Sequence, residues 1–216
     1  MGNLDRFEGA TMSVRHVPPA APPTTLAACS YLAAPLLALV YGVLRIVDGF
    51  DGSRGPGAAW TLGHLAFMAA LVLFAVMLHD MRALLGRTRM ATVTFAAGLA
   101  GIGFAFVQFA VDVVVGFMAA DHEAMGPLFD QVQAVPGVSL LVYQAGPVLF
   151  YAALVALSAQ LAAGRHVRPW MPLLVLAQTV LPVISLDLIP VGSALAVVAF
   201  LPLALRARSR SVPAHV

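Results

Sequence analysis

A series of long apolar segments constrains this chain more than any other feature. Of its 216 residues, 61% are hydrophobic and only 10% are charged, whereas a typical soluble domain is about half apolar and about a quarter charged. A helix that crosses a bilayer needs about 20 consecutive apolar residues, and the sequence holds several runs of that length. These runs exclude a soluble globular protein and predict an all-α, polytopic membrane protein.

The apolar segments predict a bundle of six transmembrane helices within residues 26–206. The last segment is too long for one crossing at about 20 residues per helix, and Asp187 and Pro190 interrupt it, so we divide it into two short helices. The predicted helices are 26–48, 58–78, 91–120, 138–163, 169–186 and 189–205. The polar, proline-rich residues 1–25 predict a disordered cytoplasmic tail, and residues 207–216 predict a basic cytoplasmic tail.

The positions of the basic residues predict how the bundle is oriented. All 12 of them are arginines, and ten fall on the side that holds the N-terminus if the helices alternate in direction. Only Arg45 and Arg54 fall on the opposite side. Because arginine and lysine gather on the cytoplasmic side of membrane proteins, we expect both termini in the cytoplasm. The absence of lysine favours a GC-rich bacterial genome, so the expected location is a bacterial plasma membrane.

Missing residue types exclude several classes of chemistry. Without lysine there is no Walker A phosphate loop and no Schiff base to retinal or pyridoxal phosphate. The single cysteine, Cys29, excludes an intrachain disulfide and a cysteine-ligated cluster. A bis-histidine haem needs two deep histidines, and only His64 lies deep in a predicted helix. We therefore expect no metal and no cofactor, and the short basic clusters beside the helices predict no nucleic-acid partner.

Polar side chains inside the apolar helices are the candidates for a site, because they cost free energy in a bilayer and usually face the interior of a bundle. In the predicted helix 91–120, small and polar residues recur at three- and four-residue steps, which places them along one face. That face consists of Ala97, Gly101, Ala105, Gln108 and Asp112. Small residues let a second helix approach closely, so we expect this face to meet protein and to carry its polar residues inward.

Other predicted helices carry polar residues at a similar depth. Trp60 and His64 are one turn apart on the same face of 58–78. In 26–48, Arg45 and Asp48 are spaced to form a pair. We infer an outward-facing polar pocket, with no comparable polar layer in the inner half of the bundle. The predicted ligand-binding residues are Tyr41, Arg45, Asp48, Trp60, His64, Gln108, Asp112 and Gln144. As an alternative, these residues only bind one another and fasten the helices together.

The loop 121–136 lies on the same side as the predicted pocket. Its apolar residues Leu128, Phe129, Val132 and Val135 have helical spacing, which predicts a small interfacial helix over the mouth. The contiguous run that begins at Asp121 contains Asp, His and Glu. Neighbouring residues rarely converge on one metal ion, so we interpret the run as a solvated loop.

One stretch resembles a known group of proteins. From Tyr41 the chain reads Tyr-Gly-Val-Leu-Arg-Ile-Val-Asp-Gly-Phe-Asp-Gly, followed by Gly55-Pro-Gly and by Trp60-Thr-Leu-Gly-His64. It resembles small multi-pass membrane proteins of high-GC actinobacteria. The resemblance covers the first two predicted helices and their loop, about a fifth of the chain, and implies a location but no activity. In size and helix number the chain is also similar to membrane-embedded terpene cyclases, without a motif that matches residue by residue.

Three functions fit these features, and the lipid bilayer is a partner in each. The first is binding or translocation of a small solute or amphiphile, and the acidic outer loops favour a cationic or neutral one. The second is an enzyme on a lipophilic substrate such as an isoprenoid, with Asp112 as general acid and His64 as base or orienter. The third is an accessory or assembly subunit of an unidentified protein partner, in which the polar residues act only as fasteners.

Overall fold

The chain is all-helical, as predicted. The computed structural model describes residues 25–211, and no β-strand occurs within them. The α-helices are α1 (Thr25–Asp48), α2 (Ala58–Leu84), α3 (Arg89–Met118), α4 (His122–Gln133), α5 (Gly146–Ala163), α6 (Trp170–Ile184) and α7 (Ile189–Ser211). A π-helical segment, η1 (Ser139–Ala145), precedes α5, and a short 3₁₀ segment, η2 (Leu186–Leu188), precedes α7.

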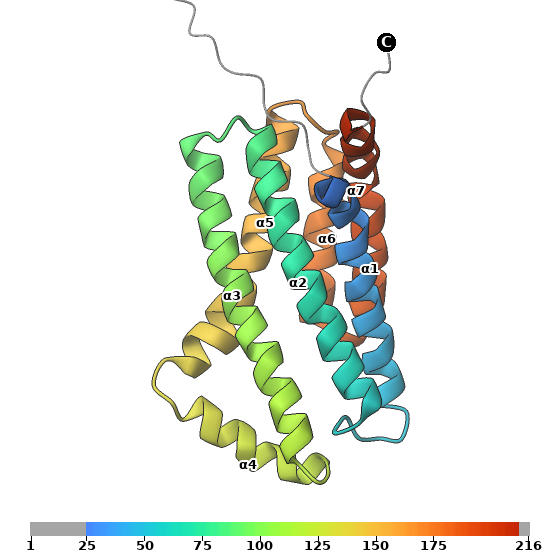
Figure 1. Cartoon of the computed structure of the whole chain (residues 1–216), viewed down its shortest axis with the longest axis vertical. Coiled ribbons are helices and arrows are strands. Elements are labelled where there is room, and N and C mark those ends of the chain that lie inside the picture. Colours follow the sequence, from blue (N-terminus) through green and yellow to red (C-terminus); the bar gives the residue numbers. More distant parts are fainter. Residues whose placement is uncertain (1–24, 212–216) are drawn as a thin grey trace, which may run out of the picture.

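Six of these helices form a ring in which consecutive members run in opposite directions (Figure 1). Contacts follow the order α1, α2, α3, α5, α6 and α7, and α7 returns to α1. The helix α4 lies across one end of the ring, next to the lower end of α3 (Figure 1). Because the six helices alternate in direction, the first residue of α1, Thr25, and the last of α7, Ser211, lie at the opposite end. The α2–α3 and α5–α6 connections lie at that end too.

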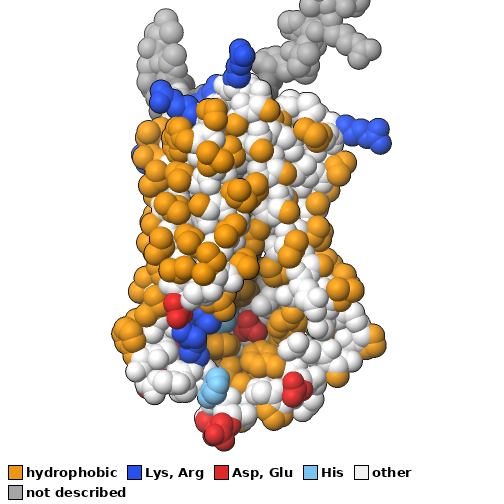
Figure 2. Space-filling view, turned by 180° about the vertical axis from the view of Figure 1, so that it is seen from behind, with side chains coloured by type: hydrophobic (Ala, Val, Ile, Leu, Met, Phe, Trp, Pro, Cys, Tyr) orange, Lys and Arg blue, Asp and Glu red, His pale blue; other side chains and the backbone are white. Residues whose placement is uncertain are grey.

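The two ends of the ring differ in charge. The end near Thr25 and Ser211 is called the arginine end, and it carries Arg82, Arg87, Arg89, Arg165, Arg168, Arg206 and Arg208. The end with α4 and η2 is called the acidic end, and it carries Asp48, Asp51, Asp121, Glu123, Asp130 and Asp187. Figure 2 shows an apolar belt between these two charged regions.

The surface of the belt is that of a membrane protein. The segments long and apolar enough to cross a membrane are Thr25–Asp48, Ala58–Leu84, Arg89–Met118, Ser139–Ala163 and Leu186–Ser209, and α6 is a shorter apolar helix. Large apolar side chains point outward around the ring, for example Val72, Leu173 and Val198, each more than half exposed. Soluble monomers rarely expose so large an apolar surface. The protein is therefore a multi-pass membrane protein.

Small residues bring α3 and α5 into close contact. A Cβ atom added to Gly101 would lie 2.4 Å from the backbone nitrogen of Phe150 and 2.7 Å from the carbonyl oxygen of Gly146. Ala105, one turn further along α3, is buried. The small-residue face predicted for the third transmembrane helix thus meets protein, and it turns the adjacent Asp112 toward the interior of the ring.

The half of the ring near the arginine end, where no polar layer was predicted, contains two polar contacts between helices. The hydroxyl of Tyr31 in α1 donates a hydrogen bond of 2.8 Å to Oδ2 of Asp80 in α2, and both residues are buried. Nε2 of Gln160 in α5 donates to Oγ1 of Thr94 in α3 at 3.1 Å. The helix α2 continues past the predicted end at residue 78, so that Asp80 lies within it, and ends at Leu84.

The last two long helices and the tails differ in detail from the sequence prediction. The segment 169–205 is divided, as predicted, because α6 ends at Ile184 and α7 begins at Ile189. The helix expected over the outer loop is α4. The helix α7 continues to Ser211, so the first part of the predicted tail 207–216 is helical. Apart from Thr25, the predicted tail 1–25 lies outside the described residues.

Candidate functional site

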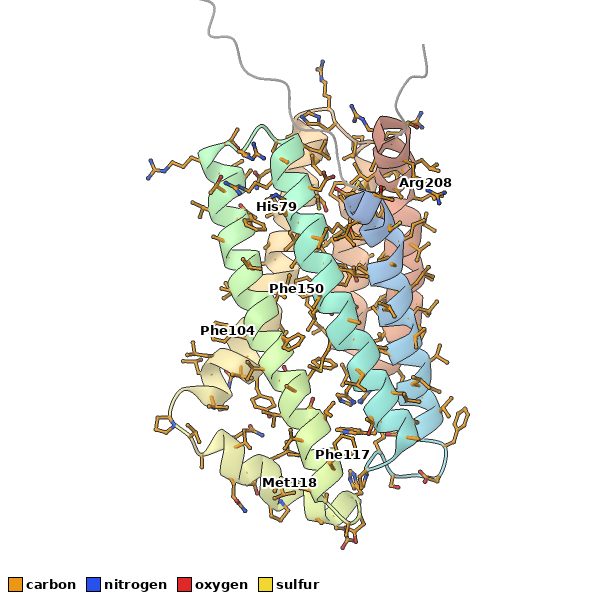
Figure 3. The ribbon with its side chains drawn as sticks, viewed as in Figure 1. His79, Phe104, Phe117, Met118, Phe150 and Arg208 are labelled. Carbon is orange, nitrogen blue, oxygen red and sulfur yellow. The ribbon has the colours of Figure 1, made fainter. Side chains whose placement is uncertain are left out.

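A cavity of about 270 Å³ lies inside the ring, in the half nearer the acidic end. Every long helix of the ring contributes to its wall. The wall consists of Tyr41, Arg45, Trp60, His64, Phe67, Ala105, Gln108, Phe109, Asp112, Pro147, Phe150, Tyr151, Pro182, Leu186 and Ile189. Figure 3 shows Phe150 between the two ends of the ring and Phe117 at the acidic end, so Phe150 marks the deep side of the cavity.

The cavity is more apolar than the sequence predicted. Most of its wall is aromatic or aliphatic, and the charged or amide groups in it are Arg45, His64, Gln108 and Asp112. The aromatic rings also contact one another. The ring of Tyr41 lies 5.5 Å from that of His64 and 5.2 Å from that of Phe109, measured between centroids. The polar groups of the cavity are therefore surrounded by aromatic rings that contact one another.

The imidazole of His64 has a fixed orientation. Its Nδ1 lies 2.7 Å from the carbonyl oxygen of Trp60, one turn earlier in α2. A carbonyl oxygen only accepts hydrogen bonds, so Nδ1 carries a proton and donates it. In a neutral ring the other nitrogen, Nε2, is then an acceptor, and it faces Oδ2 of Asp112 at 3.5 Å.

Asp112 and His64 thus face each other inside the aromatic wall of the cavity, with Oδ2 of the carboxyl group turned toward Nε2 of the imidazole. The separation of 3.5 Å is longer than a hydrogen bond of about 2.7–3.2 Å. A polar group of a ligand can thus bond to either residue without displacing a short hydrogen bond.

Trp60 connects both members of this pair. Its indole Nε1 donates a hydrogen bond of 2.9 Å to the carbonyl oxygen of Asp112, and its ring lies 4.1 Å from the His64 ring between centroids. Two glycines leave the space for the indole. A Cβ atom would lie 2.7 Å from Cδ1 of Trp60 if added to Gly116, and 2.8 Å from its Cδ2 if added to Gly55.

An ion cluster stands at the outer side of the cavity. Nη2 of Arg54 lies 2.8 Å from Oδ1 of Asp187, and Nε of Arg45 lies 4.0 Å from the same oxygen. The predicted pair of Arg45 with Asp48 is not formed. Oδ2 of Asp48 instead accepts a hydrogen bond of 2.8 Å from the backbone N–H of Gly55, which closes the α1–α2 loop.

A second cavity, of about 330 Å³, adjoins the first on the outer side and lies under α4. It shares Arg45 and Trp60 with the inner cavity, so these two side chains stand between the two spaces. Its other walls include Arg54 and His122, which are tied together because Nδ1 of His122 donates to the carbonyl oxygen of Arg54 at 2.7 Å. Figure 2 shows arginine, acidic and histidine side chains gathered in this part of the surface.

The structure brings most of the predicted ligand-binding residues together. Those that line the inner cavity are Tyr41, Arg45, Trp60, His64, Gln108 and Asp112. Asp48 lines only a very small adjoining space. Gln144 is exposed and does not line the cavity. It lies in the π-helix η1, where the hydrogen bonds span five residues instead of four, so its side chain is rotated away from the face that α-helical spacing predicts.

Sequence reasoning missed several residues of the wall. Pro147, Phe150 and Tyr151 of α5 occupy the side where Gln144 was expected. Asp187 was predicted only as part of a turn. It pairs with two arginines of other segments, and the spacing of residues near Asp187 in the sequence does not indicate these partners. Within the described residues, no group of three or more His, Cys, Asp or Glu side chains is placed to hold a metal ion.

No protein-family model, curated protein or solved structure gives a significant match to this chain. The arguments for its function therefore come from the cavity itself.

Proposed function

We propose that this protein binds a small, mainly apolar molecule with one polar group in the inner cavity. The observation that carries the proposal concerns two buried atoms in the cavity-lining side chains. Apart from the 4.0 Å ion pair of Arg45 with Asp187, Nε of Arg45 and Oε1 of Gln108 have no hydrogen-bond partner among the described residues. Buried polar atoms of native proteins are nearly always satisfied. A ligand that offers an acceptor to Arg45 and a donor to Gln108 supplies both partners.

The remaining wall supports the same kind of ligand. Ligand pockets are mainly apolar with a few placed polar groups, and they measure about 300–1,000 Å³. At about 270 Å³, this cavity suits a small molecule whose apolar part contacts the aromatic rings. Because the guanidinium group of Arg45 faces the same space, a polar group that offers a hydrogen-bond acceptor fits better than a cationic one.

Binding is favoured over translocation in this conformation. Between the inner cavity and the arginine end, large buried apolar side chains pack in the interior of the ring. Leu71, Leu78 and Leu154 have no exposed surface. On the outer side, by contrast, the inner cavity adjoins the second one and shares Arg45 and Trp60 with it. We therefore propose that the ligand enters and leaves through the acidic end.

We also propose that all six helices of the ring cross the plasma membrane of a bacterium, with the arginine end in the cytoplasm. The strong difference in arginine content between the two ends supports this orientation. The helix α6 has 15 residues, or a length of about 22 Å at 1.5 Å per residue. It packs between α5 and α7 in the ring, and this position supports a crossing beside its neighbours despite its shorter length.

Identification of a co-purified molecule tests the ligand proposal. The protein is purified in mild detergent and studied by native mass spectrometry, with Gln108→Leu and Asp112→Asn as cavity variants. Gln144→Leu is the matched control, because Gln144 is exposed outside the cavity. We expect a specific small molecule in the wild type and in Gln144→Leu, and reduced occupancy in both cavity variants. Equal occupancy in all samples, or bulk lipid alone, would contradict the proposal.

A second candidate function is catalysis on a lipophilic substrate, as the sequence suggested. The observation that favours it is the fixed imidazole of His64 beside the carboxyl group of Asp112 in an aromatic cavity. This pair can deliver a proton to an alkene or epoxide, and the surrounding rings can stabilise a developing cation. Incubation with isoprenoid and quinone-like substrates tests the idea. Product formed by the wild type and lost in Asp112→Asn supports it, whereas no turnover across the panel contradicts it.

A further inference from the structure

A concave site at the arginine end is separate from the inner cavity. It has a volume of about 430 Å³ and lies between the α5–α6 connection and the last turns of α7. Cationic side chains come from both sides: Arg165 and Arg168 from the connection, and Arg206 from α7. All three arginines are exposed. The site is thus open to the layer where the ends of the helices meet water.

The backbone of the connection holds these arginines in place. The helix α5 ends at Ala163, and Arg165 adopts a left-handed conformation with φ of 57°. Nη1 of Arg206 donates a hydrogen bond of 2.9 Å to the carbonyl oxygen of His166. This bond ties α7 to the connection, so the side chain of Arg206 is joined to the backbone segment that carries Arg165 and Arg168.

The site combines the positive charge of Arg165 and Arg168 with an apolar floor. Among the described carboxylates, none forms an ion pair with Arg165 or Arg168. The floor is formed by Met171 and Leu203, which are both buried, and Trp170 stands at the edge with 38% of its surface exposed. Tryptophan is enriched where a membrane protein meets the headgroup layer. Cationic groups above an apolar floor match a molecule that is anionic at one end and apolar at the other.

We propose that this site binds the phosphate headgroup of an anionic phospholipid, with the guanidinium groups on the phosphate and the start of an acyl chain along Trp170. Guanidinium groups present paired donors that suit phosphate oxygens, and basic pockets between transmembrane helices bind anionic headgroups. The proposal depends on the membrane location of the chain but not on the ligand of the inner cavity. Its failure would leave the proposed function untouched.

Lipid titration followed by native mass spectrometry tests this proposal on the full-length protein in detergent. The probes are phosphatidylglycerol and phosphatidylcholine, which share acyl chains and a phosphate but differ in net charge. The variant Arg165→Gln/Arg168→Gln removes two cations from the site. Its matched control is Arg87→Gln/Arg89→Gln, which removes two exposed cations of the same end, one in the α2–α3 connection and one at the start of α3, outside the site.

We expect phosphatidylglycerol to bind the wild type and the control variant about tenfold more tightly than the site variant, since each arginine near a lipid surface strengthens such binding. Phosphatidylcholine should bind all three proteins alike. Equal loss of phosphatidylglycerol in both variants would overturn the proposal, because it would show only a general effect of charge. Displacement of the lipid by millimolar glycerol phosphate would also overturn it, because the site would then take a soluble phosphate compound instead of a lipid.

Discussion

Nε2 of His64 lies 3.5 Å from Oδ2 of Asp112, and Trp60 bonds to both residues through its own backbone oxygen and its indole nitrogen. This arrangement joins α2 and α3 at the level of the inner cavity. It fixes the imidazole tautomer without the help of a second carboxylate, because a backbone carbonyl takes the Nδ1 proton. The pair is therefore free to interact with a ligand on its cavity side.

The interaction between His64 and Asp112 should be measurable as a coupling energy. We expect His64→Phe and Asp112→Asn to destabilise the protein non-additively, with a coupling of about 0.6 kcal/mol and at most about 1.7 kcal/mol, as for other polar pairs between membrane helices. Reversible unfolding in mixed micelles measures it by a double-mutant cycle. The control cycle pairs Asp112→Asn with His79→Phe, because His79 contacts Phe95 near the arginine end. Additive effects in both cycles would argue against the pair.

The hydrogen bond from Tyr31 to Asp80 should stabilise the contact between α1 and α2. Tyr31 is fully buried and its hydroxyl lies 2.8 Å from Oδ2 of Asp80. Removal of the donor in Tyr31→Phe should cost about 1–3 kcal/mol of unfolding free energy, the usual cost for a buried group that loses a bond. Tyr143→Phe is the matched control, because the hydroxyl of Tyr143 has no hydrogen-bond partner within residues 25–211. Thermal unfolding in detergent compares them, and similar midpoints for the two variants would refute the prediction.

The bond between Tyr31 and Asp80 also shows where sequence reasoning failed. Hydropathy places the end of a transmembrane helix where charged residues begin, and Asp80 is such a residue. Its partner, Tyr31, lies 49 positions earlier in the chain. The sequence pattern around Asp80 does not indicate that a side chain of another helix will donate a hydrogen bond to its carboxyl group. The helix bounds thus follow from the sequence only where the apolar segment and the helix end together.

The candidate site could be predicted to the extent that α-helical spacing holds. Trp60 and His64 share a face of α2, and Gln108 and Asp112 share one of α3, so all four reach the same cavity. Gln144 was misplaced because η1 has π-helical spacing. The predicted ion-pair partner of Arg45 was wrong for a different reason. Asp48 has the right spacing on α1, but it bonds to the α1–α2 loop, and Asp187 reaches Arg45 only through the fold.

Close packing of α3 on α5 should make Gly101 intolerant of a larger residue. A Cβ atom there would lie 2.4 Å from a backbone nitrogen of α5, and backbone atoms cannot move aside as a flexible side chain can. We expect Gly101→Ala to destabilise the protein by about 1–3 kcal/mol, as other overpacked sites do. Gly103→Ala is the control on the same helix, because nothing lies within 4 Å of a Cβ added at Gly103. Equal stability of the two variants would contradict the described packing.

The proposed orientation predicts which positions can be labelled from outside the cell. The test replaces the single cysteine, Cys29, by serine and then introduces Ser53→Cys in the α1–α2 loop or Ser209→Cys near the end of α7. Ser53 and Ser209 are both exposed and lie at opposite ends of the ring. The two substitutions are chemically identical, so differences in labelling report only on location.

With the arginine end in the cytoplasm, a membrane-impermeant maleimide should label Ser53→Cys on intact cells and should label Ser209→Cys only after the membrane is opened. This expectation follows from the alternation of the six helices, because an even number of crossings returns the chain to its starting side. The seven arginines that define the arginine end would then lie where such residues normally gather. The reverse pattern would invert the protein and place the entrance of the inner cavity in the cytoplasm. Labelling of both positions on intact cells would instead mean that α6 does not cross the membrane and that the crossing number is odd.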